Sequence, residues 1–310
     1  MTLHLGVTPW QLNPPTAAGM AEQAAFAEAQ GYQSFWLPEN HFGEGALPDP
    51  LMLLASAAAT TQTIALATTS YLLTLRNPLQ AAEQVAVLDQ LSGGRVLLGV
   101  GRGYAPEMLK AFHVPIAEKR RIFAWTLDLM RRAWLGEAIS LDGNEDNAVR
   151  VFPRPLQQPH PPIWVAAFGP KALAQAGRLG LPYLCSPMEG LQTLAANYAQ
   201  HRQAALAEGV EPATTVPLMR TVYVSNDATE TAQLRERVGS EVENTRLQPE
   251  EGVDDWTLIG DPVYVRDGIQ RYQETLGMTH LVATRLRLPG LAEPKLRDSV
   301  RLLAQTLDGV

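Results

Sequence analysis

Short apolar runs alternate with helix-forming segments along almost the whole chain of 310 residues. Alternation of this kind implies a parallel sheet, because each helix returns the chain to the start of the next strand. Eight such units favour a closed (β/α)8 TIM barrel over a doubly wound sheet. No change of composition marks a boundary, so we predict one α/β domain over residues 1–310. The predicted strands are Leu3–Thr8, Ser34–Leu37, Thr63–Thr69, Arg95–Val100, Ile163–Ala167, Tyr183–Leu184, Leu218–Val224 and His280–Thr284.

Two irregular stretches interrupt the alternation. Gly136–Pro162 is rich in Pro and Asn, with room for a small hairpin near Val149–Phe152, and Arg246–Asp255 is acidic. We predict them as insertions after strands 4 and 7. The predicted helices are Thr16–Gln30, Pro50–Ala59, Pro78–Leu91, Ala117–Leu135, Pro170–Leu179, Leu191–Glu208, Ala228–Glu243, Pro262–Leu276 and Ala292–Leu307.

Charge and cysteine content narrow the class of protein. The formal net charge is −7, which argues against nucleic acid or an anionic membrane as a partner. A single cysteine, Cys185, excludes an internal disulfide framework, and no secretory signal is visible, so we expect a cytoplasmic protein. Leu51–Leu75 is uncharged, but its Thr content divides it into a helix and a strand, so we expect no membrane span.

The stretch Gly94–Met108, with the sequence GRVLLGVGRGYAPEM, is the first candidate site. An apolar strand runs into alternating glycines around Arg102 and then into a helix start at Pro106. Such a turn can hold an anion, because backbone N–H groups approach closely and the guanidinium adds charge. A tight turn with a surface arginine is the alternative reading. The glycine spacing does not fit a dinucleotide fingerprint, and no Walker A pattern occurs.

Other kinds of catalytic centre find little support. The six histidines are scattered, and only His41, near Glu39 and Glu44, leaves room for a mononuclear metal site, so we predict no metal. No Gly-x-Ser-x-Gly elbow exists, and Cys185 is expected to be a buried small residue. In a barrel, side chains that follow the strands converge on one mouth. Here these are Glu39, Asn40, His41, Thr69, Ser70, Gly101, Arg102, Gly103, Tyr104, Phe168 and Gly169.

Several motifs together resemble the bacterial luciferase-like flavin monooxygenase family. The similarity runs from the first strand to about Leu181 and returns at Gly260-Asp261-Pro262. The combination is specific to the superfamily and leaves the substrate open. It is carried by residues 36–42 (WLPENHF), 76–79 (RNPL), 88–95 (LDQLSGGR), 99–104 (GVGRGY), 153–155 (PRP) and 161–166 (PPIWVA).

The resemblance implies a barrel that binds a flavin phosphate at the carboxyl ends of its strands. Arg102, with Gly101, Gly103 and Tyr104 beside it, matches the arginine that holds the phosphate. The turn at Phe168-Gly169 matches a second phosphate contact, made by backbone amides, although the serine often found there is missing. Thr69-Ser70 matches a non-prolyl cis peptide under the flavin ring. An ordinary polar strand end is the alternative for Thr69 and Ser70.

The resemblance also assigns candidate catalytic residues. Glu39 matches an acidic residue near the flavin, and Asn40 replaces the histidine that serves as base in luciferases. An amide cannot accept a proton near neutral pH, so His41 either takes over as the base or orients Glu39. Arg246–Asp255 matches in place a variable insertion of the family, and both a mobile lid and a solvated loop are open.

We therefore expect an FMN-dependent monooxygenase that uses reduced FMN and O2 to oxygenate a small organic substrate. A separate flavin reductase would supply the reduced FMN, and the family likeness implies a homodimer. One alternative keeps the barrel but uses a deazaflavin coenzyme for hydride transfer. Another is a non-catalytic flavin-binding barrel, which the missing base would allow.

Overall fold

A computed structural model of the chain describes residues 3–12, 16–244, 246–285 and 288–307. Strands and helices alternate in it, so the predicted α/β class is confirmed. The strands are β1 (His4–Val7), β2 (Ser34–Leu37), β3 (Ala65–Thr68), β4 (Tyr71–Leu72), β5 (Val96–Gly101), β6 (Ile163–Ala166), β7 (Tyr183–Leu184), β8 (Pro217–Val224), β9 (Thr257–Gly260) and β10 (His280–Thr284). The α-helices are α1 (Ala17–Ala29), α2 (Pro50–Ala58), α3 (Pro78–Ser92), α4 (Pro106–Ala111), α5 (Lys119–Trp134), α6 (Pro170–Arg178), α7 (Leu191–Ala207), α8 (Ala228–Glu241), α9 (Pro262–Leu276) and α10 (Glu293–Leu307).

All eight predicted strands are present, and the described residues add two more, β4 and β9. β4 is only two residues long, too short for a periodic pattern, and pairs with the end of β5. β9 follows directly on the acidic insertion. Its residues, TLIG, are all buried. The prediction of eight strands was therefore too low by these two short elements.

The chain falls into two compact units. The first comprises Met1–Pro14, Gln23–Trp36 and Ala167–Val310, and the second comprises Pro15–Glu22 and Leu37–Ala166. The prediction of a single domain over residues 1–310 stays a prediction.

In the second unit, β5 is the central strand. It pairs in parallel with β3 (Leu66↔Val96), with β4 (Tyr71↔Val100) and with β6 (Leu98↔Ile163). Helices α3 and α5 pack against each other, and the indole N–H of Trp134 donates to the carbonyl of Ala82 at 3.0 Å. Thr68 Oγ1 donates to the carbonyl of Gly99, which ties β3 to β5 near their carboxyl ends.

The motif at residues 88–95 builds the start of β5. The Arg95 side chain donates to five acceptors, among them the carbonyls of Ala58 and Ile64. The buried carboxylate of Asp89 accepts from the backbone and side-chain amides of Gln157. Because every one of these bonds joins parts of the scaffold, this stretch holds the amino end of β5 in place.

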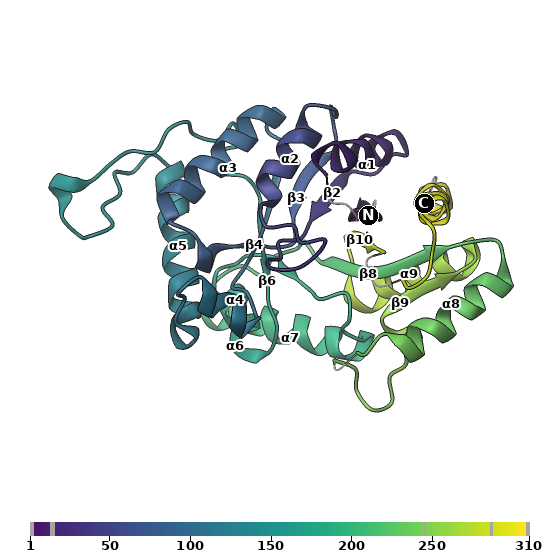
Figure 1. Ribbon diagram of the computed structural model, residues 1–310. Coiled ribbons are helices and arrows are strands. Elements are labelled where there is room, and N and C mark those ends of the chain that lie inside the picture. Colours follow the sequence, from purple (N-terminus) through teal and green to yellow (C-terminus); the bar gives the residue numbers. More distant parts are fainter. Residues whose placement is uncertain (1–2, 13–15, 245, 286–287, 308–310) are drawn as a thin grey trace. The chain divides into compact units, whose positions relative to one another are not determined.

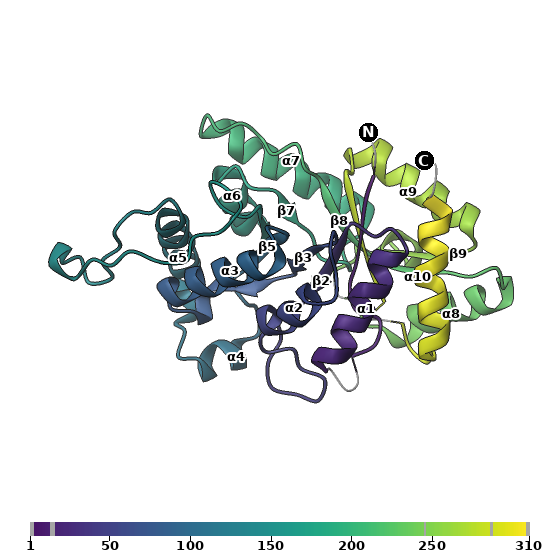
Figure 2. The ribbon, with the colours of Figure 1, turned by 90° about the horizontal axis from the view of Figure 1, so that it is seen from above.

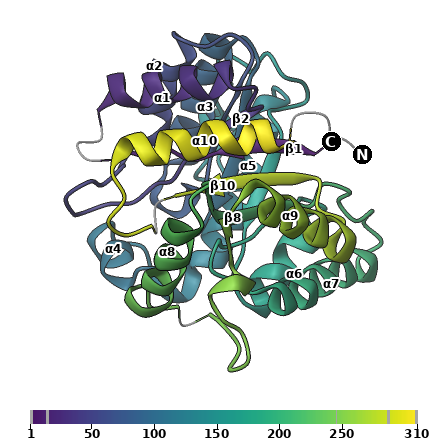
Figure 3. The same ribbon diagram turned by 90° about the vertical axis from the view of Figure 1, so that its right-hand side faces the viewer.

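In the first unit, five strands form a parallel ladder in the order β2-β1-β10-β8-β9. Each step is in register over two to five residue pairs, for example His4↔His280 and Thr221↔Thr257. Figure 3 shows α8, α9 and α10 around β8 and β10. Helices α6 and α7 lie side by side (Figure 2). A buried apolar cluster that includes Tyr223 and Trp256 fills the space between β8, β9 and α8.

The two predicted insertions differ in how they are held. The stretch after α5 projects away from that helix (Figure 1) and contains one antiparallel bridge, Ile139↔Val149, in place of the hairpin predicted near Val149–Phe152. The described part of Arg246–Asp255 packs Leu247 and Val253 onto the Trp256 cluster and ends in a 3₁₀ turn, Val253–Asp255. No helix within the described ranges is long and apolar enough to cross a membrane.

Candidate functional site

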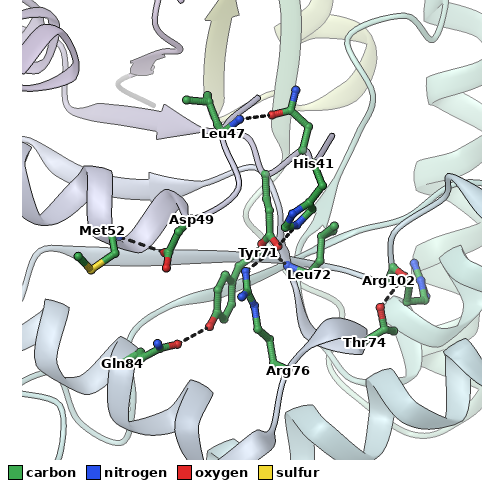
Figure 4. A network of polar contacts seen from close by, with 12 residues as sticks. His41, Leu47, Asp49, Met52, Tyr71, Leu72, Thr74, Arg76, Gln84 and Arg102 are labelled. Carbon is green, nitrogen blue, oxygen red and sulfur yellow. Dashed lines mark hydrogen bonds and ion pairs between the residues drawn. The ribbon is translucent and has the colours of Figure 1, made fainter. Parts of the chain in front are cut away.

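A buried carboxylate, Glu39, lies two residues after the end of β2. Figure 4 labels three of the residues that contact it, His41, Leu72 and Arg76. Its side chain has no exposed surface. One oxygen, Oε2, accepts from the backbone N–H of Leu72 at 2.9 Å. The other, Oε1, lies 2.6 Å from Arg76 Nη2 and 2.9 Å from His41 Nε2. Burial of a charged carboxylate is costly unless it is paired, and here three donors surround it.

Arg76 comes from the turn that precedes α3. The next residue, Asn77, caps α3 by accepting from the N–H groups of Leu79 and Gln80, and Pro78 begins the helix. The Arg76 guanidinium lies 4.6 Å from the centre of the Tyr71 ring. The motif RNPL thus starts a helix and aims a guanidinium at Glu39, a role that its sequence did not reveal.

His41 faces Glu39 on one side and aromatic rings on the other. The Phe112 ring meets the imidazole edge-on at 4.8 Å, and Phe42 stacks on Phe112 at 5.5 Å. Phe42 has a positive φ of 59° and is 68% exposed. Asn40 does not join this group. It closes its own loop, since its side-chain oxygen accepts from the N–H of Leu47 and its N–H donates to the Leu47 carbonyl.

The peptide bond between Thr69 and Ser70 is cis, as the resemblance implies. The N–H of Thr69 donates to the carbonyl of Leu37 at 2.7 Å, which sets this bond beside the end of β2. Gly101, at the end of β5, makes room for it. A Cβ on Gly101 would overlap with Ser70 Oγ. The glycine is therefore required by the close approach of Ser70.

Arg102 follows β5 and is buried. Its Nη2 donates to the carbonyl of Ala166 at 2.8 Å, and its guanidinium lies 5.1 Å from the centre of the Phe123 ring. Its backbone carbonyl accepts from Thr74 Oγ1 at 2.9 Å (Figure 4). Burial and the neighbouring charge of Arg120 lower the pKa of the Arg102 guanidinium to about 10. The alternative of a surface arginine is thus wrong, because the side chain is buried.

Two further cations, which the sequence reading did not single out, lie near Arg102. Lys119 Nζ lies 3.4 Å from the carbonyl oxygen of Gly103, and Lys119 begins α5, with Arg120 next to it. Burial, Arg102 and Arg120 together lower the pKa of Lys119. Three cations that repel one another around one turn favour an anion there. The sequence offered one signal for these cations. Lys119 and Arg120 stand at the start of a predicted helix that follows the glycine turn.

Three other predicted residues are exposed or belong to the first unit. Tyr104 is 84% exposed. Gly169 precedes α6, which begins at Pro170 as predicted. Phe168 is 61% exposed, and the Arg246 guanidinium lies 4.2 Å from the centre of its ring. Their contacts with a cofactor stay predictions.

The second unit therefore holds two different polar groups. The Glu39 group pairs its charges within itself and includes the imidazole of His41. The Arg102 group gathers positive charge around a glycine turn, which fits the phosphate of a flavin nucleotide. Among the residues that the structure describes, no three His, Cys, Asp or Glu side chains are placed to hold a metal ion.

Comparison with known proteins gives one family. A family model described as luciferase-like monooxygenase matches residues 2–279. An F420-dependent glucose-6-phosphate dehydrogenase of Kineococcus radiotolerans is 31% identical over 92% of this chain and 90% of its own length. An uncharacterized protein of Sinorhizobium fredii is 32% identical over 73% of this chain, and a second one is 37% identical over 53%. The chain spans only 64% and 50% of these two proteins.

Solved structures share the fold. Monooxygenase RslO1 from Streptomyces bottropensis matches with a TM-score of 0.80 and 25% identity, over 99% of this chain and 98% of the other. The oxygenating constituent of 3,6-diketocamphane monooxygenase from Pseudomonas putida, in complex with FMN, matches with a TM-score of 0.80 and 20% identity over the same shares. An F420-dependent secondary alcohol dehydrogenase matches with a TM-score of 0.76 and 17% identity, over 99% of this chain and 98% of the other. The second and third likenesses speak for the fold alone.

Proposed function

Because the chain belongs to the luciferase-like monooxygenase family and has its (β/α)8 fold, we propose that it is an FMN-dependent monooxygenase acting on a small organic substrate. Members of this family are oxidoreductases that use a flavin or a deazaflavin, and the finer assignment to FMN and oxygen is our proposal. The observation that carries it is the glycine turn at Gly101–Gly103, with Arg102 buried in it and Lys119 beside it. When bound, reduced FMN would supply the electrons that activate O2.

Arg102 would bind the flavin phosphate, and Lys119 and Arg120 would add positive charge around it. A phosphate carries nearly two negative charges at pH 7, so it would relieve the mutual repulsion that lowers the pKa of Arg102 and Lys119. The space that Gly101 leaves for Ser70 sets the Thr69–Ser70 peptide at the end of β5, in the part of the site where the flavin ring is expected.

His41 is the group that can exchange a proton with the substrate, since Asn40 cannot and Glu39 is paired on both oxygens. The Phe112 and Phe42 rings beside it exclude water from one side of the imidazole. These contacts favour a catalytic barrel over the alternative of a non-catalytic flavin-binding one.

A second candidate function is hydride transfer with a deazaflavin coenzyme. It is favoured by the 31% identity with an F420-dependent dehydrogenase along nearly the whole of both chains. The same turn would bind the phosphate of either coenzyme, so the two functions differ in the coenzyme's ring and in the need for O2.

Equilibrium titration under anaerobic conditions tests the proposal. FMN, reduced FMN, riboflavin and coenzyme F420 would each be added to the purified protein, with binding followed by absorbance and fluorescence. We expect micromolar affinity for FMN or its reduced form and affinity for riboflavin lower by a factor of about 30, because riboflavin lacks the charged phosphate contact. Binding of F420 alone would select the second function, and binding of none at high micromolar concentration would reject both.

The proposal also concerns the source of reduced flavin and the assembly of the protein. A separate reductase would deliver reduced FMN, as the likeness to the family implies. The homodimer and the cytoplasmic location remain predictions.

A further inference from the structure

The Glu39 carboxylate contacts two cation-forming side chains through the same oxygen. Arg76 Nη2 lies 2.6 Å and His41 Nε2 lies 2.9 Å from Oε1. Oε2 is occupied by the N–H of Leu72. A carboxylate accepts and cannot donate when it is ionised, so the atom of His41 that faces it carries the proton. Nε2 is therefore the protonated nitrogen, and Nδ1 makes no hydrogen bond to a described residue.

Among the described residues, Glu39 is the one side chain that accepts a hydrogen bond from Arg76. Its Nη2 donates to Glu39, and its buried Nε has no partner in the described part of the chain. Stacking on Tyr71, whose hydroxyl donates to Gln84, keeps the guanidinium in place. An arginine stays charged at any physiological pH, so this contact balances the carboxylate permanently.

We propose that Arg76 is a positioning residue which, by balancing the charge of Glu39, keeps His41 neutral with its proton on Nε2 and its lone pair on Nδ1. Without Arg76, the buried carboxylate would be left with His41 as its one cationic partner, and it would favour the imidazolium. The imidazolium has no lone pair and cannot accept a proton from a substrate. The use of Nδ1 as the base rests on the proposed function, whereas the charge state of His41 does not.

Among the described residues, His41 contacts Glu39 and the aromatic rings of Phe42 and Phe112. From α4 and the residues after it, the imidazole meets the uncharged ring of Phe112. On the strand side, Tyr71 and Asp49 interact with Arg76, and Asp49 also caps α2 through the N–H of Met52. Among the described residues, Glu39 is thus the charged group in contact with His41, and Arg76 is the charged group in contact with Glu39.

The experiment is a 15N NMR spectrum of the histidine side chains at pH 7.5, on the protein without any cofactor, with His41→Asn to assign the signals. In the wild type we expect the 15N shifts of His41 to be those of the neutral Nε2–H form. In Arg76→Gln we expect at least about half of His41 as imidazolium, with return to the neutral form in Arg76→Lys and in Glu39→Gln/Arg76→Gln. Arg121→Gln, which removes an exposed arginine paired with Glu118, serves as the matched control and should change nothing.

A wild-type His41 that is doubly protonated, or protonated on Nδ1, would overturn the proposal even if Arg76→Gln failed to fold. A folded Arg76→Gln protein with the wild-type spectrum would overturn it as well. Because no flavin is present, these outcomes are independent of the titration that tests the proposed function.

Discussion

The two polar groups of the second unit use arginine in opposite ways. At the end of β2, Arg76 meets a carboxylate that has no exposed surface, so charge is balanced within the protein. At the end of β5, Arg102 is buried beside Lys119 and Arg120, so like charges are held together. Balanced charges fix geometry and persist without a ligand. A group of like charges attracts a ligand of the opposite charge.

This difference predicts which property each group controls. Substitutions in the Glu39 group should lower the stability of the protein whether or not a cofactor is present. Substitutions in the Arg102 group should lower affinity for a phosphate and leave the unfolding free energy less affected, since relief of repulsion offsets part of the lost contact.

Glu39→Gln should have the largest effect. It leaves Arg76 without its anionic partner in a partly buried place, and breaking such a pair should lower the unfolding free energy by about 3 kcal/mol. Urea denaturation measures it. Glu44→Gln, an exposed carboxylate in the same loop, is the matched control and should lower the free energy by less than about 0.5 kcal/mol. Equal effects at both positions would remove the contrast between the two groups.

Arg102→Met should come next. Loss of a charged hydrogen bond to a phosphate corresponds to about 2 kcal/mol, so FMN should bind roughly 30-fold more weakly, while the affinity for riboflavin changes by less than about threefold. Isothermal titration calorimetry with both ligands measures the difference, and Arg121→Gln on the exposed face of α5 is the control. If FMN and riboflavin lose affinity alike, Arg102 acts on the shape of the site and not on the phosphate.

Lys119→Gln should have the smallest effect, because this side chain is only partly buried and water screens its charge. We expect FMN affinity to fall about three- to fivefold at low salt and less at high salt. The pKa of Lys119 is lowered, so the wild-type affinity should decline as the pH rises into the alkaline range and Lys119 loses its proton. That decline should be weaker in Lys119→Gln. A pH profile that is the same in both proteins would assign the decline to another group.

Most of the fold could be predicted from the sequence, because its elements repeat a simple pattern. Even the two-residue strand Tyr183–Leu184 lies where the pattern of apolar residues and turns indicates it. β4 and β9 could not be predicted in the same way. One is too short to show a period, and the other is recognised by burial that depends on the packing of α8 and α9.

The sequence offers Glu39 and His41 as neighbouring candidates, but it does not predict which side chains they pair with. Glu39 and His41 are two residues apart, yet Arg76 reaches them from 37 and 35 positions further along, and nothing in the motif RNPL says which carboxylate it meets. Similarly, Lys119 contacts the carbonyl of Gly103 because α5 begins at Lys119. Such contacts depend on the direction of side chains in the folded unit, which periodicity does not encode.

The bond from the Leu72 N–H to Glu39 has a consequence for how such a protein can diversify. The same carboxylate supports a strand of the scaffold and holds the imidazole, so variation at position 39 cannot alter chemistry without also weakening the fold. Asn40 and Phe42 do not combine these two roles. Asn40 closes its own loop, and Phe42 is largely exposed. Laboratory evolution toward new substrates should therefore accumulate changes at positions 40 and 42 while leaving Glu39 untouched.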